Sequence, residues 1–234
     1  MAENRVTKLN LGCGIHVCRL PGWENIDNSP NAWLAQHPWL RGILYRMGVL
    51  PEELYRVPWP PQIRILDASL GLPFADNSIE IIYTSHMLEH LSRERVCGLI
   101  RKVHGVLRPG GIVRVVVPDL EQLAGEYVQA TQALARGSCW GEESAPGDKL
   151  VSELRLSPPL GRRVWGIPVA ARSGSYHHWM YDFVSLKRLL ERGGFQQIER
   201  RRYLDSAIPE IAELDIAERA EGSLYVEARK GEFG

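Results

Sequence analysis

Short apolar runs alternate with helical patterns along most of this chain, and this alternation constrains the fold more than any other feature. Near-continuous apolar and β-branched runs are typical of strands in a sheet that is covered on both faces. Strands that alternate with helices predict a mostly parallel sheet with helices on both faces. The expected strands are 8–11, 23–26, 63–66, 79–83, 112–117, 195–203 and 223–228.

The helical pattern is clearest at 96–107, where apolar residues recur with helical spacing before Pro109-Gly110-Gly111. Asp119 with Gln122 predicts the capped start of a second helix, which we expect to end at Gly137. We expect this second helix to bury an apolar stripe, made of Leu120, Leu123, Ala124, Tyr127 and Val128. The connection 12–22 is too short for a full helix, so we expect at most a single turn there.

Two segments, 28–62 and 138–176, do not fit the alternation and are interpreted as insertions into one domain, 1–234. Each is interpreted as following the C-terminal end of a strand, the edge where open α/β sheets bind ligands. We therefore expect substrate lids, with a dimer contact or a mobile loop as the alternative for each. A homodimer stays open on this evidence.

Composition excludes several classes of function. The 28 Lys and Arg balance the 28 Asp and Glu, whereas a protein that binds nucleic acid electrostatically would show a basic excess. No apolar stretch reaches the ~20 residues of a membrane span. The four cysteines are scattered, which argues against a disulfide scaffold or a structural zinc site. We expect a soluble cytoplasmic protein with no nucleic-acid or membrane partner.

Three successive strand ends carry groups that suit a nucleoside ligand. Gly12 and Gly14 form a turn directly after the first strand, where backbone can approach a ligand closely. Val17 occupies the position of the third glycine of a dinucleotide fingerprint, which weakens a nicotinamide-cofactor interpretation. Asp27 and Asp67 end the next two strands, where carboxylates can accept from ribose hydroxyls and an exocyclic amine. Each aspartate alone is equally compatible with a turn cap.

With these features, the sequence resembles the class I S-adenosylmethionine-dependent methyltransferases. It is most similar to small-molecule enzymes with a Gly-Trp-x-Asn-x-Asp element, here 22–27. The resemblance implies a Rossmann-like fold with a seven-stranded, mostly parallel sheet in the order 3-2-1-4-5-7-6. It also implies S-adenosylmethionine as cofactor and S-adenosylhomocysteine as product. The implied cofactor-binding residues are Asn10, Gly12, Cys13, Gly14, Asp27, Asn28, Asp67, Ala68, Ser85 and His86. Asn10 and His16 depart from the family pattern, which commonly has an acidic residue and a glycine there.

The segment 86–90 reads His-Met-Leu-Glu-His and matches a zinc-protease pattern. On a helix, His86, Glu89 and His90 would share one face. The segment directly follows an expected parallel strand, and a similar Leu-Glu-His occurs there in the resembled family. We therefore expect no metal, and we expect Glu89 and His90 to orient the segment rather than to contact the acceptor.

The candidate catalytic residues are His177, His178 and Tyr181, in the segment that returns to the sheet after the second insertion. Methyl transfer depends mostly on in-line alignment, and an oxygen or nitrogen acceptor also needs a base. We expect His177 to be that base or a substrate ligand, with packing of the lid as the equal alternative. The predicted function is methyl transfer to O or N of a small molecule, such as a sugar or natural-product intermediate. The rivals are a catalytically silent cofactor-binding or assembly protein with the same fold and, less favoured, an aminopropyl transferase.

Overall fold

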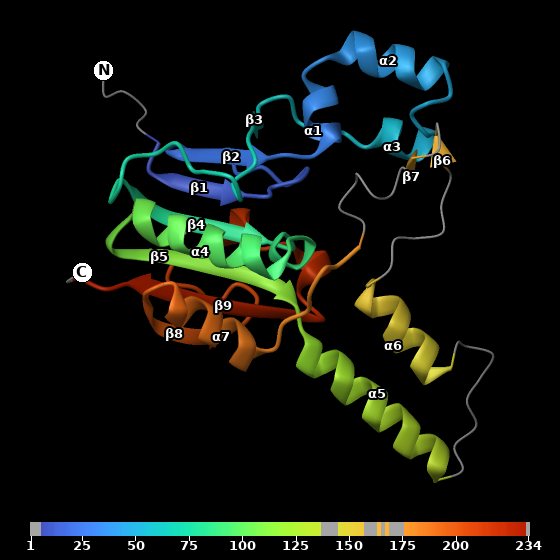
Figure 1. Cartoon of the computed structure of the whole chain (residues 1–234), viewed down its shortest axis with the longest axis vertical. Helices are drawn as coiled ribbons and strands as arrows, with labels where there is room; N and C mark the ends of the chain where they lie inside the picture. Colours follow the sequence, from blue (N-terminus) through green and yellow to red (C-terminus); the bar gives the residue numbers. More distant parts are fainter. Residues whose placement is uncertain (1–5, 137–144, 157–162, 165–166, 169–175, 233–234) are drawn as a thin grey trace.

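The computed structural model describes residues 6–136, 145–156, 163–164, 167–168 and 176–232. Its main feature is a seven-stranded sheet in the order β3-β2-β1-β4-β5-β9-β8 (Figure 1). Numbered along the chain, these seven strands have the order 3-2-1-4-5-7-6, which confirms the predicted topology. In this sheet, β9 runs opposite to the other six strands and pairs antiparallel with both β5 and β8. The strands are β1 Lys8–Leu11, β2 Trp23–Asp27, β3 Arg64–Ile65, β4 Ile79–Ser85, β5 Leu107–Pro118, β8 Phe195–Arg201 and β9 Ser223–Lys230.

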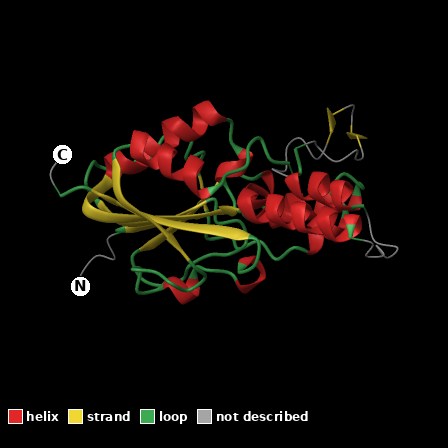
Figure 2. Cartoon of the chain, turned by 90° about the horizontal axis from the view of Figure 1, so that it is seen from below, coloured by secondary structure: helices red, strands yellow, loops and turns green. Residues whose placement is uncertain are grey.

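One face of the sheet is covered by two α-helices, α4 (Arg93–Val106) and α7 (Phe183–Arg192), as Figure 2 shows from the side. The predicted apolar positions of α4 are buried in a core cluster with Leu186 and Leu190 of α7. A capping box of Asp182 and Ser185 fixes the start of α7. The helical periodicity of both segments thus correctly predicts which side of each helix is buried.

The opposite face is covered differently from the prediction. Within the described residues, it carries the segment 202–222 with two short 3₁₀ helices, η3 (Ile211–Glu213) and η4 (Ala217–Arg219), instead of long α-helices. Ile208, Ile211 and Leu214 of this segment pack on the sheet. The expectation of long helices on both faces is therefore wrong for this face. The irregular segment shields the sheet from water through its apolar side chains, as a helix would.

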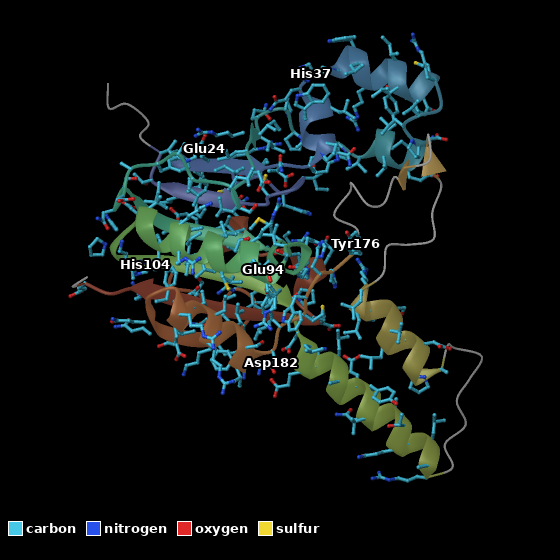
Figure 3. All side chains as sticks on the ribbon, in the orientation of Figure 1. Glu24, His37, Glu94, His104, Tyr176 and Asp182 are labelled. Carbon is cyan, nitrogen blue, oxygen red and sulfur yellow. The ribbon has the colours of Figure 1, made fainter. Side chains whose placement is uncertain are left out.

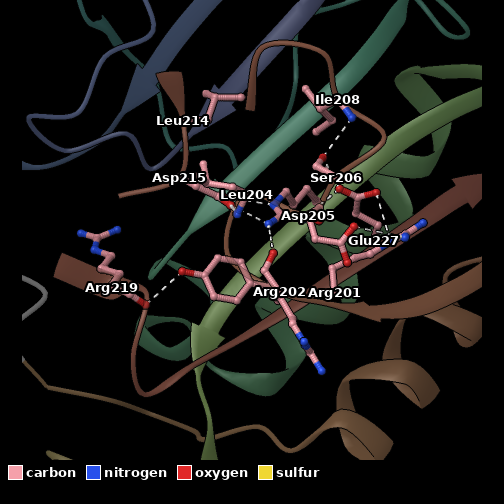
Figure 4. A network of polar contacts seen from close by, with 12 residues as sticks. Arg201, Arg202, Leu204, Asp205, Ser206, Ile208, Leu214, Asp215, Arg219 and Glu227 are labelled. Atoms are coloured by element: carbon pink, nitrogen blue, oxygen red, sulfur yellow. Dashed lines mark hydrogen bonds and ion pairs between the residues drawn. The ribbon is translucent and has the colours of Figure 1, made fainter. Parts of the chain in front are cut away.

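A buried arginine of β5 fixes this covering segment to the sheet. Arg114 is fully buried and pairs with Asp215 through two hydrogen bonds, of 3.1 and 2.6 Å, and with Glu227 at 2.9 Å. Its remaining N–H groups donate to the carbonyl oxygens of Arg202 and Asp205. Figure 4 shows that Asp215 and Glu227 also accept hydrogen bonds from Leu204 and Ser206 within this covering segment. All five donors of the guanidinium are thereby used.

The helix α5 (Leu120–Ala135) extends away from the sheet, with α6 (Pro146–Leu154) beside it (Figure 1). Asp119 caps α5 through the amides of Glu121 and Gln122, as predicted. The predicted buried stripe is wrong, because no residue of α5 is buried and Tyr127 and Val128 are 37% and 47% exposed. Leu123 and Tyr127 of the stripe lie beside α6, and most of the helix extends beyond the sheet. Gly137 lies outside the described residues.

The first insertion forms three helices, α1 (Pro30–Ala35), α2 (Pro38–Arg46) and α3 (Glu52–Arg56). The described part of the second insertion consists of α6 and a small ribbon of β6 (Arg163–Val164) and β7 (Ile167–Pro168). Residues 12–22 contain no helix, as their number predicts. Among the described residues, no helix is both long and apolar enough to span a membrane.

Candidate cofactor-binding site

A cavity of about 350 Å³ lies at the carboxyl ends of β1, β2 and β4. This is the edge where open α/β sheets bind ligands. The cavity brings together eight of the ten residues predicted to bind the cofactor. These are Gly12, Gly14, Asp27, Asn28, Asp67, Ala68, Ser85 and His86.

The glycine turn forms one wall of the cavity. Gly12 and Gly14 have φ angles of +67° and +55°, which L side chains rarely adopt. A Cβ atom on Gly12 would lie 2.7 Å from the side chain of Met87, whereas a Cβ atom on Gly14 would meet nothing within 4 Å. Gly12 is therefore required by packing, and Gly14 leaves its side of the turn open.

Both predicted aspartates line the cavity and also cap turns. Asp27 accepts from the amide of Gly14 at 2.9 Å and from the amide of Ser29 at 2.7 Å, one hydrogen bond to each oxygen. Asp67 uses Oδ1 to accept from the amide and hydroxyl of Ser69, and its Oδ2 lies 3.8 Å from Arg95. A carboxylate oxygen has two lone-pair sites, so capping and ligand binding are compatible here.

Asn10 and Cys13 do not line the cavity. Asn10 is 3% exposed and donates to the carbonyl of His16 and to Oδ1 of Asn25. Asn25 in turn bonds both backbone groups of Cys18, so this pair shapes the connection between β1 and β2. The thiol of Cys13 is buried, and burial raises its pKa well above the usual range. Both residues are thus buried on the side of the glycine turn away from the cavity.

Sequence reasoning missed Arg219, which reaches the cavity from η4. Its guanidinium donates to the carbonyl and the hydroxyl of Ser85, at 3.3 and 2.9 Å. Next to it, His86 has a φ of +52°, a strained conformation for a non-glycine residue, and its Nε2 lies 3.0 Å from the hydroxyl of Ser223. No periodic pattern marks the segment of Arg219, so sequence gave no signal for it. Ten other lining residues were also missed, namely Ile26, Ser29, Pro30, Trp59, Leu66, Ser69, Met87, His90, Leu91 and Arg95.

The three candidate catalytic residues occupy different environments. His177 is 6% exposed, and its ring centroid lies 5.2 Å from that of His90, which lines the cavity. His178 is exposed, and Tyr181 is 3% exposed within the core cluster under α4 and α7. Burial raises the pKa of Tyr181 to about 12. Only His177 therefore lies beside the cavity.

The segment 86–90 does not form the helix that its pattern suggests. Only η1 (Leu88–His90) is helical, as a single 3₁₀ turn. Its carbonyl at Glu89 accepts from the amides of His178 and Trp179, which fixes the return segment against it. Figure 3 shows Tyr176 at the start of that segment, and its carbonyl accepts from Nδ1 of His90 at 2.9 Å. His90 also lines the cavity.

The strand order and the position of the cavity define a Rossmann-like methyltransferase fold of class I. Residues 48–115 match the model of the family described as a methyltransferase domain. The fold, together with this match over less than a third of the chain, makes the protein similar to S-adenosylmethionine-dependent methyltransferases, whose cofactor is S-adenosylmethionine. No curated protein matches the sequence.

Solved structures with similar folds have low sequence identity to this chain. A SAM-dependent methyltransferase from Archaeoglobus fulgidus is 15% identical with a TM-score of 0.48, over 95% of this chain and 85% of that one. Human N-acetylserotonin methyltransferase, solved with SAM, is 13% identical with a TM-score of 0.48, over 97% and 48%. A protein described as a possible exported protein of Bordetella parapertussis is 15% identical with a TM-score of 0.46, over 97% and 62%. The chain thus spans less than two thirds of the length of several proteins that it resembles.

The residues around the cavity fit this cofactor. The open side of Gly14 leaves room beside the turn, and Asp27 is 9% exposed at the end of β2 with lone pairs still free. Arg219 supplies a positive charge at the end of β4, with which a carboxylate of a ligand in the cavity could pair. Desolvation lowers the pKa of Arg219, but an arginine keeps its charge at neutral pH even so.

Proposed function

We propose that this protein transfers the methyl group of S-adenosylmethionine to an oxygen or nitrogen of a small molecule in the cytoplasm. The observation that carries this proposal is the position of His177. This buried imidazole lies beside the cavity through its contact with His90. A small acceptor in that cavity would meet both the cofactor site and a group able to hold or accept a proton.

We assign the cofactor contacts to residues at successive strand ends. Asp27 would bind the ribose hydroxyls, and Asp67 with Ala68 would hold the adenine. Arg219 would bind the methionine carboxylate, because the connection after β1 has no helix whose N-terminus could do so. When bound, the cofactor supplies an already activated methyl group, so the protein mainly has to align the acceptor.

The chain's own groups suit a neutral or weakly acidic acceptor. Burial lowers the pKa of His177, so its ring is neutral near pH 7 and able to accept a proton or a hydrogen bond. Trp59, from the first insertion, lines the same cavity and offers an aromatic face for a ring-shaped acceptor. This placement supports a lid role for the first insertion.

The cytoplasmic location is supported by cysteine chemistry. Within the described residues, Cys13, Cys18 and Cys97 are free thiols, and the first two are buried. Free thiols persist in reducing compartments. A homodimer stays a prediction.

Thermal unfolding with S-adenosylmethionine, S-adenosylhomocysteine or NAD, each alone, tests the cofactor site. At 100 times its dissociation constant a ligand adds roughly 2.7 kcal/mol, which raises the melting temperature of a chain of this size by about 5–10 °C. We expect this shift with the two S-adenosyl ligands and none with NAD. A shift with NAD alone, or with none of the three, would contradict the site.

Two variants test the assigned contacts by calorimetric titration. Loss of a charged hydrogen bond costs roughly 1.5–3 kcal/mol, so Asp27→Asn and Arg219→Gln should each weaken S-adenosylmethionine binding by about 10–100-fold. Asp76→Asn and Arg188→Gln change exposed residues of the same type and should leave affinity unchanged. Equal affinity in all four variants would refute the assignment.

Turnover separates an enzyme from a silent binding protein. The protein is incubated with labelled S-adenosylmethionine and pools of sugars, phenols and amines, and S-adenosylhomocysteine is measured. We expect its formation to depend on one pool and to fall in His177→Gln. Tight cofactor binding without turnover in any pool or in a metabolite extract would favour the binding-protein alternative.

A further inference from the structure

Three ligand-type side chains, among them His177, meet next to the cofactor cavity, outside the contacts assigned to the cofactor. Glu89 and His90 belong to η1, and His177 belongs to the return segment. One carboxylate oxygen and one ring nitrogen from each histidine lie within 4.8 Å of one another. Glu89 and His177 are buried, and His90 lines the cavity. The group is therefore enclosed on one side and open to the cavity on the other.

Glu89 has a carboxylate that the described protein atoms leave uncompensated. The residue is 0% exposed, and neither carboxylate oxygen has a hydrogen-bond partner there. His86 Nδ1 lies 3.2 Å from Oε1 without hydrogen-bond geometry. Burial of an ionised carboxylate is strongly unfavourable unless a counter-charge or hydrogen bonds compensate it. A positive group beside the carboxylate of Glu89 would therefore stabilise this arrangement.

The two histidines are oriented to present a lone pair. Nδ1 of His90 contacts the carbonyl of Tyr176 at 2.9 Å, and Nδ1 of His177 contacts the carbonyl of Leu154 at 3.0 Å. A carbonyl can only accept, so each Nδ1 carries the proton and each Nε2 of the neutral ring is left with its lone pair. Histidine ligands of metals typically donate their other N–H to a carbonyl in this way.

A metal-free explanation requires an additional proton. With both Nδ1–H groups directed to carbonyls, a histidine could donate to Glu89 only as an imidazolium. A carboxylate, two lone pairs on nitrogen and an open side match a His₂-carboxylate site, in which a catalytic metal keeps one position free.

We propose that Glu89, His90 and His177 bind one divalent transition-metal ion, with Zn²⁺ as the best-suited metal, at the edge of the cofactor cavity. The inference differs from the sequence pattern at 86–90, because the third ligand is His177 in place of His86. The open position would take an oxygen of the acceptor and favour its ionised form, a role that rests on the proposed function. His177 is then a ligand, and the acceptor proton leaves to solvent.

Co²⁺ serves as the probe, because its visible absorption reports a tetrahedral or five-coordinate site. Chelator-treated protein without a polyhistidine tag is titrated with CoCl₂, and ZnCl₂ is then added in competition. We expect one equivalent of Co²⁺ per chain and its displacement by Zn²⁺. Glu89→Gln, His90→Gln and His177→Gln should each weaken binding by at least about 10-fold. Glu94→Gln and His37→Gln, at sites labelled in Figure 3, are the matched controls and should bind as the parent does.

Stability provides a second readout that does not need activity. Glu89→Gln removes the uncompensated charge, so the metal-free variant should melt no lower than the metal-free parent, while Zn²⁺ should raise only the parent's melting temperature. Absent Co²⁺ absorption, or equal affinity in the ligand and control variants, would overturn the metal site. A retained S-adenosylmethionine shift together with S-adenosylhomocysteine formation in the metal-free protein would show that the proposed function survives that failure.

Discussion

Arg114 offers the sharpest test of what holds the sheet and its covering segment together. Methionine has a similar length, so Arg114→Met keeps the volume and removes the five N–H donors. Asp215 and Glu227 then stay buried without their counter-charge. Removing one partner of a buried ion pair costs about 3–5 kcal/mol. At about 2–4 °C per kcal/mol for a chain of 234 residues, the melting temperature should fall by about 6–20 °C.

Urea unfolding followed by tryptophan fluorescence measures this loss. Arg108→Met is the matched control, because Arg108 lies on the same strand and pairs with Glu80 at 2.9 Å but is 54% exposed. An exposed pair contributes only about 0–1 kcal/mol. Adding Asp215→Asn and Glu227→Gln to Arg114→Met should recover part of the loss, since the orphaned charges cause it. A loss in Arg114→Met as small as that of the control would refute this reasoning.

Two further predictions concern the glycine turn and pH. Gly12→Ala and Gly14→Ala both place alanine at positive φ, which costs roughly 1–2 kcal/mol, but only the Gly12 variant must also displace Met87. Thermal melts of the ligand-free protein should therefore show the larger loss of stability in Gly12→Ala, and equal losses in the two variants would contradict the contact with Met87. Burial lowers the pKa of His104 and His177, so the unfolded chain binds protons more readily than the folded protein. The free energy of unfolding should therefore be full above about pH 6.5 and fall below it. His104→Gln should reduce the slope of the unfolding free energy against pH by up to about 1.4 kcal/mol per pH unit, and an unchanged slope would argue against the pKa shift of His104.

The sheet and eight of the residues that line the cavity were predictable because their signals are local. A strand that ends in glycine or aspartate places that residue at the ligand-binding edge whatever the rest of the chain does. The environment of α5 was not predictable, because an apolar stripe indicates that one side avoids water and does not say what covers it. The partners of Arg114 were equally hidden, since Asp215 and Glu227 are 101 and 113 positions away.

The candidate site shows the same division between local and distant information. Glu89 and His90 are adjacent in sequence, so a local pattern at 86–90 indicates them. The return segment that adds His177 follows an insertion, and its contact with η1 depends on two backbone hydrogen bonds to the carbonyl of Glu89. Arg219 likewise reaches Ser85 from 134 positions away. Tertiary structure alone brings these groups to one cavity.

The position of β9 has a consequence for how the chain acquires its fold. This strand lies between β5 and β8, and it pairs with a strand made about a hundred residues earlier, Pro118 opposite Ser223. While synthesis proceeds through 119–222, β5 has an open edge and β8 has no partner in the described sheet. Such a long closure is slow, and an unpaired edge attracts other chains. A nascent chain stalled before Ser223 should therefore stay sensitive to proteases and bind chaperones, and both properties should disappear once β9 has been made.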